Sequence, residues 1–104
     1  MSVLLEFSMF PTDKGESVSA YVSQVIAMIR DSGIPYRLTP MGTIIETDSL
    51  DQALGLVGQA YGILEQAGCN RVYSSLKLDI RKGKEGRLQG KVDSIRQKIG
   101  DVAD

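Results

Sequence analysis

Two long stretches near the two ends of the chain alternate between apolar and polar residues. Residues 3–10 read VLLEFSMF, and residues 71–81 read RVYSSLKLDIR. A period of two residues is that of a β-strand with one apolar face, because successive side chains point to opposite sides of the strand. The apolar faces consist of Val3, Leu5, Phe7 and Met9 in the first stretch and of Val72, Leu76, Leu78 and Ile80 in the second. Any fold for this chain must therefore cover one face of each of two long strands.

The segment after the first strand has the pattern of an amphipathic helix followed by a hairpin. Apolar residues between Val18 and Ile29 recur at intervals of three and four residues, so they lie on one side of a helix. Ser17 or Asp13 is expected to cap its start. Two short strands, YRLT at 36–39 and TIIET at 43–47, flank the turn PMG. The sequence therefore predicts a second and a third strand next to each other.

A second helix is predicted between this hairpin and the last long strand. Ser49 and Gln52 have the spacing of a capping box, and Gly68 is placed to end the helix. Glycines at 55, 58 and 62 fall close to one face, which suits the approach of another backbone, either in this chain or in another subunit. A basic turn, KGKEGR, then leads to a last helix, whose narrow apolar stripe consists of Leu88, Val92, Ile95 and Ile99.

The predicted order of elements is β-α-β-β-α-β-α. Split β-α-β units in this order form the ferredoxin-like sandwich, in which a four-stranded antiparallel sheet carries two helices on one face. The first and third strands are then the central pair, flanked by the fourth and the second. We therefore predict an α+β, ferredoxin-like βαββαβ domain over residues 1–104 with an additional C-terminal helix. The face of the sheet away from the two helices is either solvated or covered by something else.

The absence of histidine and the presence of a single cysteine limit the chemistry. Histidine is absent, which removes the commonest general base and the commonest zinc ligand. Cys69 is the single cysteine, so it can form no disulfide within the chain and has no histidine to activate it. We expect Cys69 to be a packed structural residue, since free cysteine is often buried. The sequence thus predicts neither a catalytic role nor a metal site.

Charge and hydropathy limit the range of partners. The chain has 104 residues, of which 42% are hydrophobic, and a net charge of −1. This is the composition of a globular domain, and the near-neutral charge disfavours binding of nucleic acid through its phosphates. The first ten residues lack the basic region of a signal peptide, and no stretch approaches the length of a membrane span. We therefore expect a cytoplasmic protein without nucleic-acid or membrane partners.

The uncovered face of the predicted sheet mixes charged and apolar residues. Strand alternation places Glu6, Ser8 and Phe10 there, together with Glu46 and Ile44. The last strand adds Tyr73, Ser75, Lys77, Asp79 and Arg81, and the second adds Tyr36 or Leu38, depending on register. A solvated face with cross-strand ion pairs would explain the charges. The aromatic and aliphatic residues favour a subunit interface that lines a binding site.

Several motifs resemble those of a known family. PMGTIIE at 40–46, NRVYSSLKLDIR at 70–81 and GKVDSI at 90–95 are similar to the small thiamine-binding, YkoF-like proteins. The resemblance extends over essentially the whole chain, including FSMFPTDKGESVSAYV at 7–22. One departure is Thr47, where the family pattern has a glycine. The resemblance implies a ferredoxin-like subunit that forms dimers or tetramers through its sheet faces and binds thiamine or its hydroxymethylpyrimidine half without catalysis or a further cofactor.

The resemblance also implies where a ligand binds. Thr43 and Glu46 match the hairpin motif, and Ser8 and Pro11 match the opening strand. We expect Glu46 to be the principal anchor, because a carboxylate forms charge-assisted contacts with a cation or with a pyrimidine edge. Asp79 is the expected second acid, and Thr43 and Ser8 are the expected hydroxyl partners.

The remaining predicted site residues are basic or aromatic. Lys77 and Arg81 match the last-strand motif and are expected to hold the two acids in place. Tyr36 or Phe10 is expected to stack on the rings of the ligand, as aromatic faces do with cations.

Three other functions compete with thiamine binding. A ferredoxin-like regulatory or assembly module that senses a different small metabolite is one, since a fold does not fix a function. An acylphosphatase-like enzyme would need an arginine in a phosphate-cradling loop, and the turns TDKGES and KGKEGR show no such arrangement. An RNA-binding module would need exposed aromatics in a basic surround, which the acids oppose.

Overall fold

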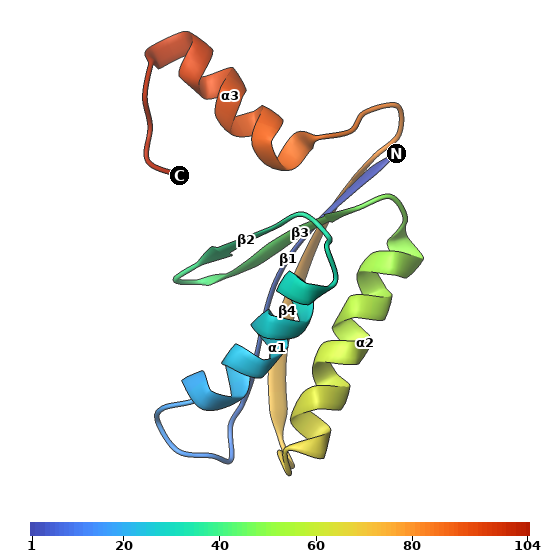
Figure 1. The fold of residues 1–104 in the computed structure, drawn as a ribbon, viewed down its shortest axis with the longest axis vertical. Coiled ribbons are helices and arrows are strands. Elements are labelled where there is room, and N and C mark those ends of the chain that lie inside the picture. Colours follow the sequence, from blue (N-terminus) through green and yellow to red (C-terminus); the bar gives the residue numbers. More distant parts are fainter.

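A computed structural model describes residues 1–104 as seven elements in the predicted order. The strands are β1 (Ser2–Pro11), β2 (Tyr36–Thr39), β3 (Gly42–Thr47) and β4 (Val72–Arg81). The helices are α1 (Ser19–Asp31), α2 (Leu50–Gln66) and α3 (Arg87–Ile99). The ferredoxin-like fold with an additional C-terminal helix is thereby confirmed (Figure 1).

The four strands form one antiparallel sheet in the order β2-β3-β1-β4. The central pair is β1 with β3, as predicted, and their register places Leu5 opposite Ile45 and Phe7 opposite Thr43. On its other side β1 pairs with β4 along its whole length, from Ser2 opposite Arg81 to Pro11 opposite Val72. Opposed residues of antiparallel strands point to the same face, so this register fixes which side chains share a face.

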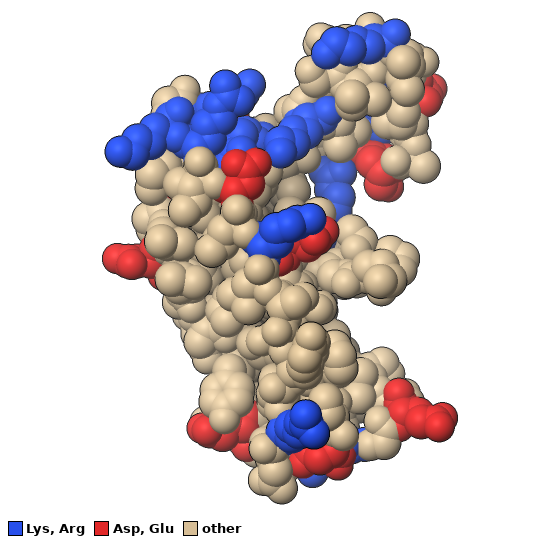
Figure 2. Space-filling view, turned by 180° about the vertical axis from the view of Figure 1, so that it is seen from behind, with Lys and Arg blue, Asp and Glu red and all other residues tan.

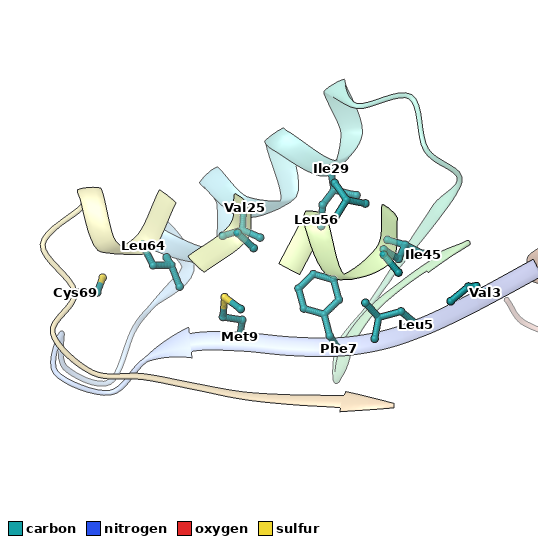
Figure 3. Close-up of a cluster of buried hydrophobic side chains, with 12 residues drawn as sticks. Val3, Leu5, Phe7, Met9, Val25, Ile29, Ile45, Leu56, Leu64 and Cys69 are labelled. Carbon is teal, nitrogen blue, oxygen red and sulfur yellow. The ribbon is translucent and has the colours of Figure 1, made fainter. Parts of the chain in front are cut away.

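The core lies between the sheet and the helices α1 and α2 (Figure 3). From β1, the side chains of Val3, Leu5, Phe7 and Met9 all point towards these helices. The helices contribute Val25 and Ile29 from α1, and Ala53, Leu56, Ala60 and Leu64 from α2. Cys69 belongs to the same cluster, which agrees with its predicted structural role. The period-two pattern of β1 therefore identified the buried face correctly.

The helix ends agree with the sequence in α2 and differ in α1. The Ser49 hydroxyl accepts a hydrogen bond from the backbone N–H of Gln52 at 3.1 Å, as the capping box predicts. At the start of α1, no side chain caps the helix. Neither Ser17 nor Asp13 therefore has the predicted role, and Asp13 instead accepts a hydrogen bond from the backbone N–H of Asn70 at 2.8 Å.

The third helix lies on the other side of the sheet from α1 and α2 (Figure 1). It contacts β3 and β1 near the N-terminus of the chain. We call the sheet face away from α1 and α2 the open face, and α3 covers one end of it. Figure 2 shows the hollow that remains between α3 and the rest of the molecule. The open face, which the sequence left either solvated or covered, is thus covered in part by α3 of the same chain.

Candidate functional site

The sheet register divides the predicted site residues between the two faces. Six of them share the open face: Ser8, Phe10, Glu46, Lys77, Asp79 and Arg81. Thr43 is opposite Phe7 and lies on the face covered by α1 and α2, where it is buried. Tyr36 is opposite Ile45 and lies on that face as well. Two predictions are therefore wrong. Thr43 does not lie beside Glu46, because residues three apart in a strand point to opposite faces. Tyr36 and Leu38 do not point to the open face, because they are opposite Ile45 and Thr43, which face the helices.

The carboxylate of Glu46 caps α3. One oxygen accepts hydrogen bonds from the Ser2 hydroxyl at 2.6 Å and from the backbone N–H of Arg87 at 2.9 Å. The other oxygen accepts a hydrogen bond from the backbone N–H of Leu88 at 3.0 Å. The helix begins after Gly86, which has no side chain to serve as a cap, so a carboxylate from β3 satisfies its first N–H groups. A negative charge at this end is also favoured by the helix dipole.

Arg87, in the first turn of α3, joins three parts of the chain and is 3% exposed. Its guanidinium donates hydrogen bonds to the Ser2 hydroxyl, to the backbone carbonyls of Ser2 and Asp79, and it forms an ion pair with the Asp79 carboxylate at 2.9 Å. Lys91 also pairs with Asp79, at 3.2 Å. We call Ser2, Glu46, Asp79 and Arg87 the α3 clamp. The expectation that Lys77 and Arg81 hold Glu46 and Asp79 is wrong, since Arg87 does so.

Both carboxylates of the clamp have lowered pKa values. Partial burial alone would raise the pKa of Glu46, but the hydrogen bonds from Ser2, Leu88 and Arg87 outweigh burial and leave the pKa below its usual value. The hydrogen bond and ion pair with Arg87 lower the pKa of Asp79, and Lys91 adds to this effect. Both groups are therefore carboxylates at neutral pH, and both already have partners.

A pocket of about 510 Å³ lies between the open face and α3, and we call it the open-face pocket. Leu4, Glu6, Arg37, Ile44, Lys77 and Asp79 line it from the sheet, and Arg87, Leu88, Lys91 and Val92 line it from α3. Glu6 pairs with Lys77 at 3.3 Å, as predicted for a cross-strand contact. Four cationic groups and two carboxylates line the pocket, and all six form ion pairs, Arg37 with Asp104 at 3.3 Å. This charge distribution does not suit a cationic ligand.

Further along the open face, away from α3, Ser8 and Phe10 each contact the residue opposite them on β4. The Ser8 and Ser75 hydroxyls are 3.3 Å apart, and the rings of Phe10 and Tyr73 lie 5.8 Å apart between centroids. These four side chains form a polar and aromatic surface rather than an enclosed site. Arg81 is separate from them, since it lies opposite Ser2 at the end of the sheet next to α3.

A second pocket, of about 390 Å³, lies on the helix side and is mostly apolar. We call it the hairpin pocket, because the β2–β3 hairpin forms one wall and the first turns of α1 form another. Its hairpin residues are Leu38 to Thr43, its helix residues are Val18, Val22, Val25 and Ile26, and its β1 residues are Phe7 to Phe10. No charged residue lines it. Of the predicted site residues, Thr43 has its side chain on this side of the sheet, whereas Ser8 and Phe10, whose side chains lie on the open face, border the pocket along the edge of β1.

Hydrogen-bonding groups in the hairpin pocket come from Thr43 and from the edge of β1. None of the side-chain hydrogen bonds uses the Thr43 hydroxyl, whereas the Thr39 hydroxyl is occupied within the turn, donating to the Gly42 carbonyl at 2.8 Å. The pairing of β1 with β3 ends at Phe7 opposite Thr43. Beyond that point, residues 8–10 of β1 have no neighbouring strand on the hairpin side, so their backbone edge is available to a ligand.

Gly42 allows the hairpin to lie this close to β1. A Cβ atom at this position would be 3.1 Å from the Phe7 carbonyl oxygen, which is a tight contact with backbone. The glycine of the PMGT motif therefore has a packing reason in this structure, and it sets the position of Thr43 next to it.

Tyr36 lines a neighbouring groove instead of either pocket. This groove, of about 430 Å³, runs between α1 and β2, and it shares Val22, Ile26 and Leu38 with the hairpin pocket. The Tyr36 side chain is half-buried against the core. The structure thus separates Tyr36 from Phe10, the other aromatic residue predicted to stack on a ligand.

Two further observations concern membrane-spanning helices and metal-binding groups. None of the three helices is long and apolar enough to cross a membrane. The structure contains no group of three or more side chains that could hold a metal ion.

Comparison with known families supports the resemblance found in the motifs. A family model described as thiamine-binding protein matches residues 5–96. The chain is 37% identical over 93 residues to UPF0045 protein MJ1052 of Methanocaldococcus jannaschii, with 89% of this chain and 91% of that protein covered. The crystal structure of MJ1052 superimposes with a TM-score of 0.77 over 90% of this chain and 95% of that chain.

Two other crystal structures have the same fold. A Bacillus cereus domain of unknown function, DUF77, is 28% identical, with a TM-score of 0.80 and coverage of 94% of this chain and 93% of that chain. The Thermotoga maritima protein TM0486, whose description suggests a part in thiamine biosynthesis or salvage, is 21% identical with a TM-score of 0.78. It covers 92% of this chain and 100% of its own, and at this identity the similarity concerns the fold alone.

Proposed function

Because this chain belongs to the thiamine-binding protein family, we propose that it is a non-catalytic binding protein for thiamine or its hydroxymethylpyrimidine half, and that the pyrimidine ring binds in the hairpin pocket. One observation carries this choice of site. The two motifs FSMF and PMGT, which are far apart in the sequence, line the same pocket.

The chemistry of the hairpin pocket suits an uncharged aromatic ring. Its volume lies within the range of about 300–1,000 Å³ typical of small-molecule sites, and its walls are apolar. The Thr43 hydroxyl and the free edge of β1 at residues 8–10 offer donors and acceptors to the amino group and ring nitrogens of an aminopyrimidine. The positively charged thiazolium ring of thiamine would extend towards solvent, since the pocket contains no acid to stabilise it.

Glu46 was the anchor expected from the sequence, and the structure offers a different explanation of its position. Its oxygens accept three hydrogen bonds from Ser2, Arg87 and Leu88, so a ligand would have to compete with these partners for the carboxylate. We therefore propose that Glu46 stabilises the fold next to the open-face pocket, whereas Thr43 contacts the ligand.

Calorimetry with thiamine and with hydroxymethylpyrimidine tests both the function and the site. Wild-type protein should bind both compounds. Thr43→Val removes one hydroxyl and should weaken binding roughly 2- to 10-fold, the usual effect of one neutral hydrogen bond. Tyr36→Phe is the matched control, because it removes a hydroxyl from the adjacent groove and should leave affinity unchanged.

Glu46→Gln separates the two pockets. Binding that survives in Thr43→Val but is lost in a folded Glu46→Gln variant would place the ligand near the α3 clamp and contradict the hairpin pocket. No binding of either compound by the wild type would contradict the proposed function itself.

The open-face pocket favours a second candidate function, which is the sensing of a different, anionic metabolite. The four cationic groups that line this pocket, Arg37, Lys77, Arg87 and Lys91, outnumber its two carboxylates. A thermal-shift screen of small carboxylates and phosphates would detect such binding, and Lys91→Met should abolish the shift while leaving the thiamine response unchanged.

We also propose that the chain forms a homo-oligomer through its open face, as the family resemblance implies. The surface around Phe10 and Tyr73 lies beyond the part that α3 covers, and Tyr73 is exposed. Aromatic residues are enriched at protein interfaces. Tyr73→Glu should therefore reduce the molecular mass measured by light scattering if this face is a subunit contact.

A further inference from the structure

Positive charge is concentrated where β4 leads into α3. Residues 81–91, which read RKGKEGRLQGK, contain five of the 12 lysines and arginines of the chain and only one of its 13 acids. Figure 2 shows lysine and arginine side chains gathered at this end of the molecule. A hollow lined by charges of one sign attracts ions of the other sign, even in a chain with a net charge of −1.

A small pocket of about 160 Å³ lies among these residues, and we call it the basic pocket. Arg81, Lys84, Glu85 and Gly86 line it from the end of β4 and the following turn, and Arg87, Gly90, Lys91 and Ser94 line it from α3. None of these residues is hydrophobic. An apolar ligand would bury no apolar surface here, so the pocket suits a small charged group.

Two of the four cations in the basic pocket have no partner in the chain. Neither Arg81 nor Lys84 forms an ion pair, and both are exposed. Arg87 and Lys91 pair with Asp79, at 2.9 and 3.2 Å, and are thereby held beside the pocket. The open-face pocket differs in this respect, since all of its cations are paired. An anion can therefore reach the basic pocket without breaking an ion pair.

Small residues leave room on the α3 side of the basic pocket. Gly86, Gly90 and Ser94 are spaced four residues apart, which places them on one side of the helix. No atom lies within 4 Å of the Cβ positions that the two glycines lack. A side chain at position 90 would therefore take up space in the pocket, and the Ser94 hydroxyl can donate a hydrogen bond from the same side.

We propose that the basic pocket binds a phosphate group, with Arg81 and Lys84 as its main contacts. The planar guanidinium of Arg81 can donate two parallel hydrogen bonds to phosphate oxygens, and Lys84 supplies a compact positive charge. The backbone N–H groups at the start of α3 are not needed, because Glu46 already accepts hydrogen bonds from the first two. This inference does not rest on the proposed function, since the basic pocket shares no residue with the hairpin pocket.

The walls of the basic pocket favour a phosphate carried by a small molecule over one in a nucleic-acid backbone. Proteins that hold single-stranded nucleic acid usually combine a basic groove with aromatic side chains on which the bases stack. The basic pocket has no aromatic residue, and its volume suits a single phosphate group. The ligand class is therefore a small phosphate monoester or inorganic phosphate.

Calorimetric titration with inorganic phosphate and with glycerol phosphate at low salt tests the site. Arg81→Met and Lys84→Met should each weaken binding roughly tenfold or more, because each removes a charge-assisted contact. Lys82→Met is the matched control. It removes the same charge between the two positions but from a residue that does not line the pocket, so affinity should change less than about twofold.

Variants at positions 85 and 90 test the same pocket in both directions. Glu85 is the one acid that lines it, so Glu85→Gln should strengthen binding roughly threefold or more. Gly90→Glu places a carboxylate in the pocket and should abolish binding. Gly90→Ala is its control, since both substitutions favour the helix and only one adds charge.

Four results would overturn the proposal. Wild-type protein that binds neither compound would exclude the site. Binding lost in Lys77→Met but retained in Arg81→Met would place the anion in the open-face pocket, which Lys77 alone of these two lines. Equal losses in Lys82→Met and Arg81→Met would mean attraction by overall charge only. Tighter binding of a single-stranded RNA than of glycerol phosphate would assign the basic pocket to a nucleic acid.

Discussion

The two faces of the sheet hold their helices by different interactions. On one face, α1 and α2 pack through aliphatic and aromatic side chains that are almost fully buried. On the other face, α3 is anchored by a buried arginine and two carboxylates, and Arg87 is its one buried residue. Apolar packing is spread over many contacts, whereas the α3 clamp depends on a few directional ones. We therefore expect the core on one side of the sheet to unfold cooperatively and α3 on the other side to unfold separately from it.

The largest expected effect concerns the core face. Leu5→Ala should lower the free energy of unfolding by about 2–5 kcal/mol, because Leu5 is fully buried and its truncation leaves a cavity. Leu4→Ala is the matched control, since Leu4 is the next residue on β1 and points to the open face. Chemical denaturation should show a clearly smaller loss for Leu4→Ala. Equal losses would mean that the open face contributes as much as the core to global stability.

The next effect concerns the clamp. Arg87→Met removes the guanidinium that joins Ser2 and Asp79, and the loss of a charge-assisted hydrogen bond costs about 1.5–3 kcal/mol. Amide hydrogens of α3 should therefore exchange roughly 10- to 100-fold faster, with those of α1 and α2 unchanged.

Lys91→Met serves as the control for Arg87→Met. It removes only the exposed partner of Asp79, and exposed ion pairs contribute little. If Arg87→Met instead lowered the protection of all three helices together, α3 would belong to the same cooperative unit as the core.

The smallest effect is expected from acid. Glu46 and Asp79 have pKa values in the folded protein that lie below their ordinary values of 4.5 and 3.8. A lowered pKa stabilises the folded state above the ordinary value, and this contribution is lost as the pH falls through the folded value. Below about pH 4.5, backbone NMR resonances of α3 should therefore move towards disordered positions before those of α1 and α2.

Glu46→Gln checks the source of this acid sensitivity. The variant cannot lose a charge at position 46, so its α3 resonances should change less between pH 6 and pH 3, although α3 should be less stable at neutral pH. A core that unfolds at a higher pH than α3 would reverse the expected order.

Alternation along the strands made most of the fold predictable from the sequence. The faces of β1 and β4 follow from a period of two over ten residues, and the cap of α2 follows from Ser49 and Gln52. The same rule already implied that Thr43 and Glu46, three residues apart in one strand, lie on opposite faces. The shared motif obscured this, because residues adjacent in a sequence pattern need not be adjacent in space.

The clamp could not be predicted in the same way. Arg87 lies in a basic segment, KGKEGR, that is typical of a solvated turn, and its partners are distant in the sequence. One local signal was present. Gly86 precedes α3 without a side chain that can cap it, so its first N–H groups needed an acceptor from elsewhere. Glu46, an acid between an isoleucine and a threonine on β3, is that acceptor.

The clamp also has a consequence for the order in which the chain acquires its structure during synthesis. The hydrogen bond between Arg87 and Ser2 connects residues 85 positions apart, so it forms only when nearly the whole chain is available. All four strands and both core helices precede α3 in the sequence. A chain emerging from a ribosome can therefore complete its sheet and core before its last helix exists. Until then Ser2, Glu46 and Asp79 remain hydrated, and the final segment closes over them as the last step of folding.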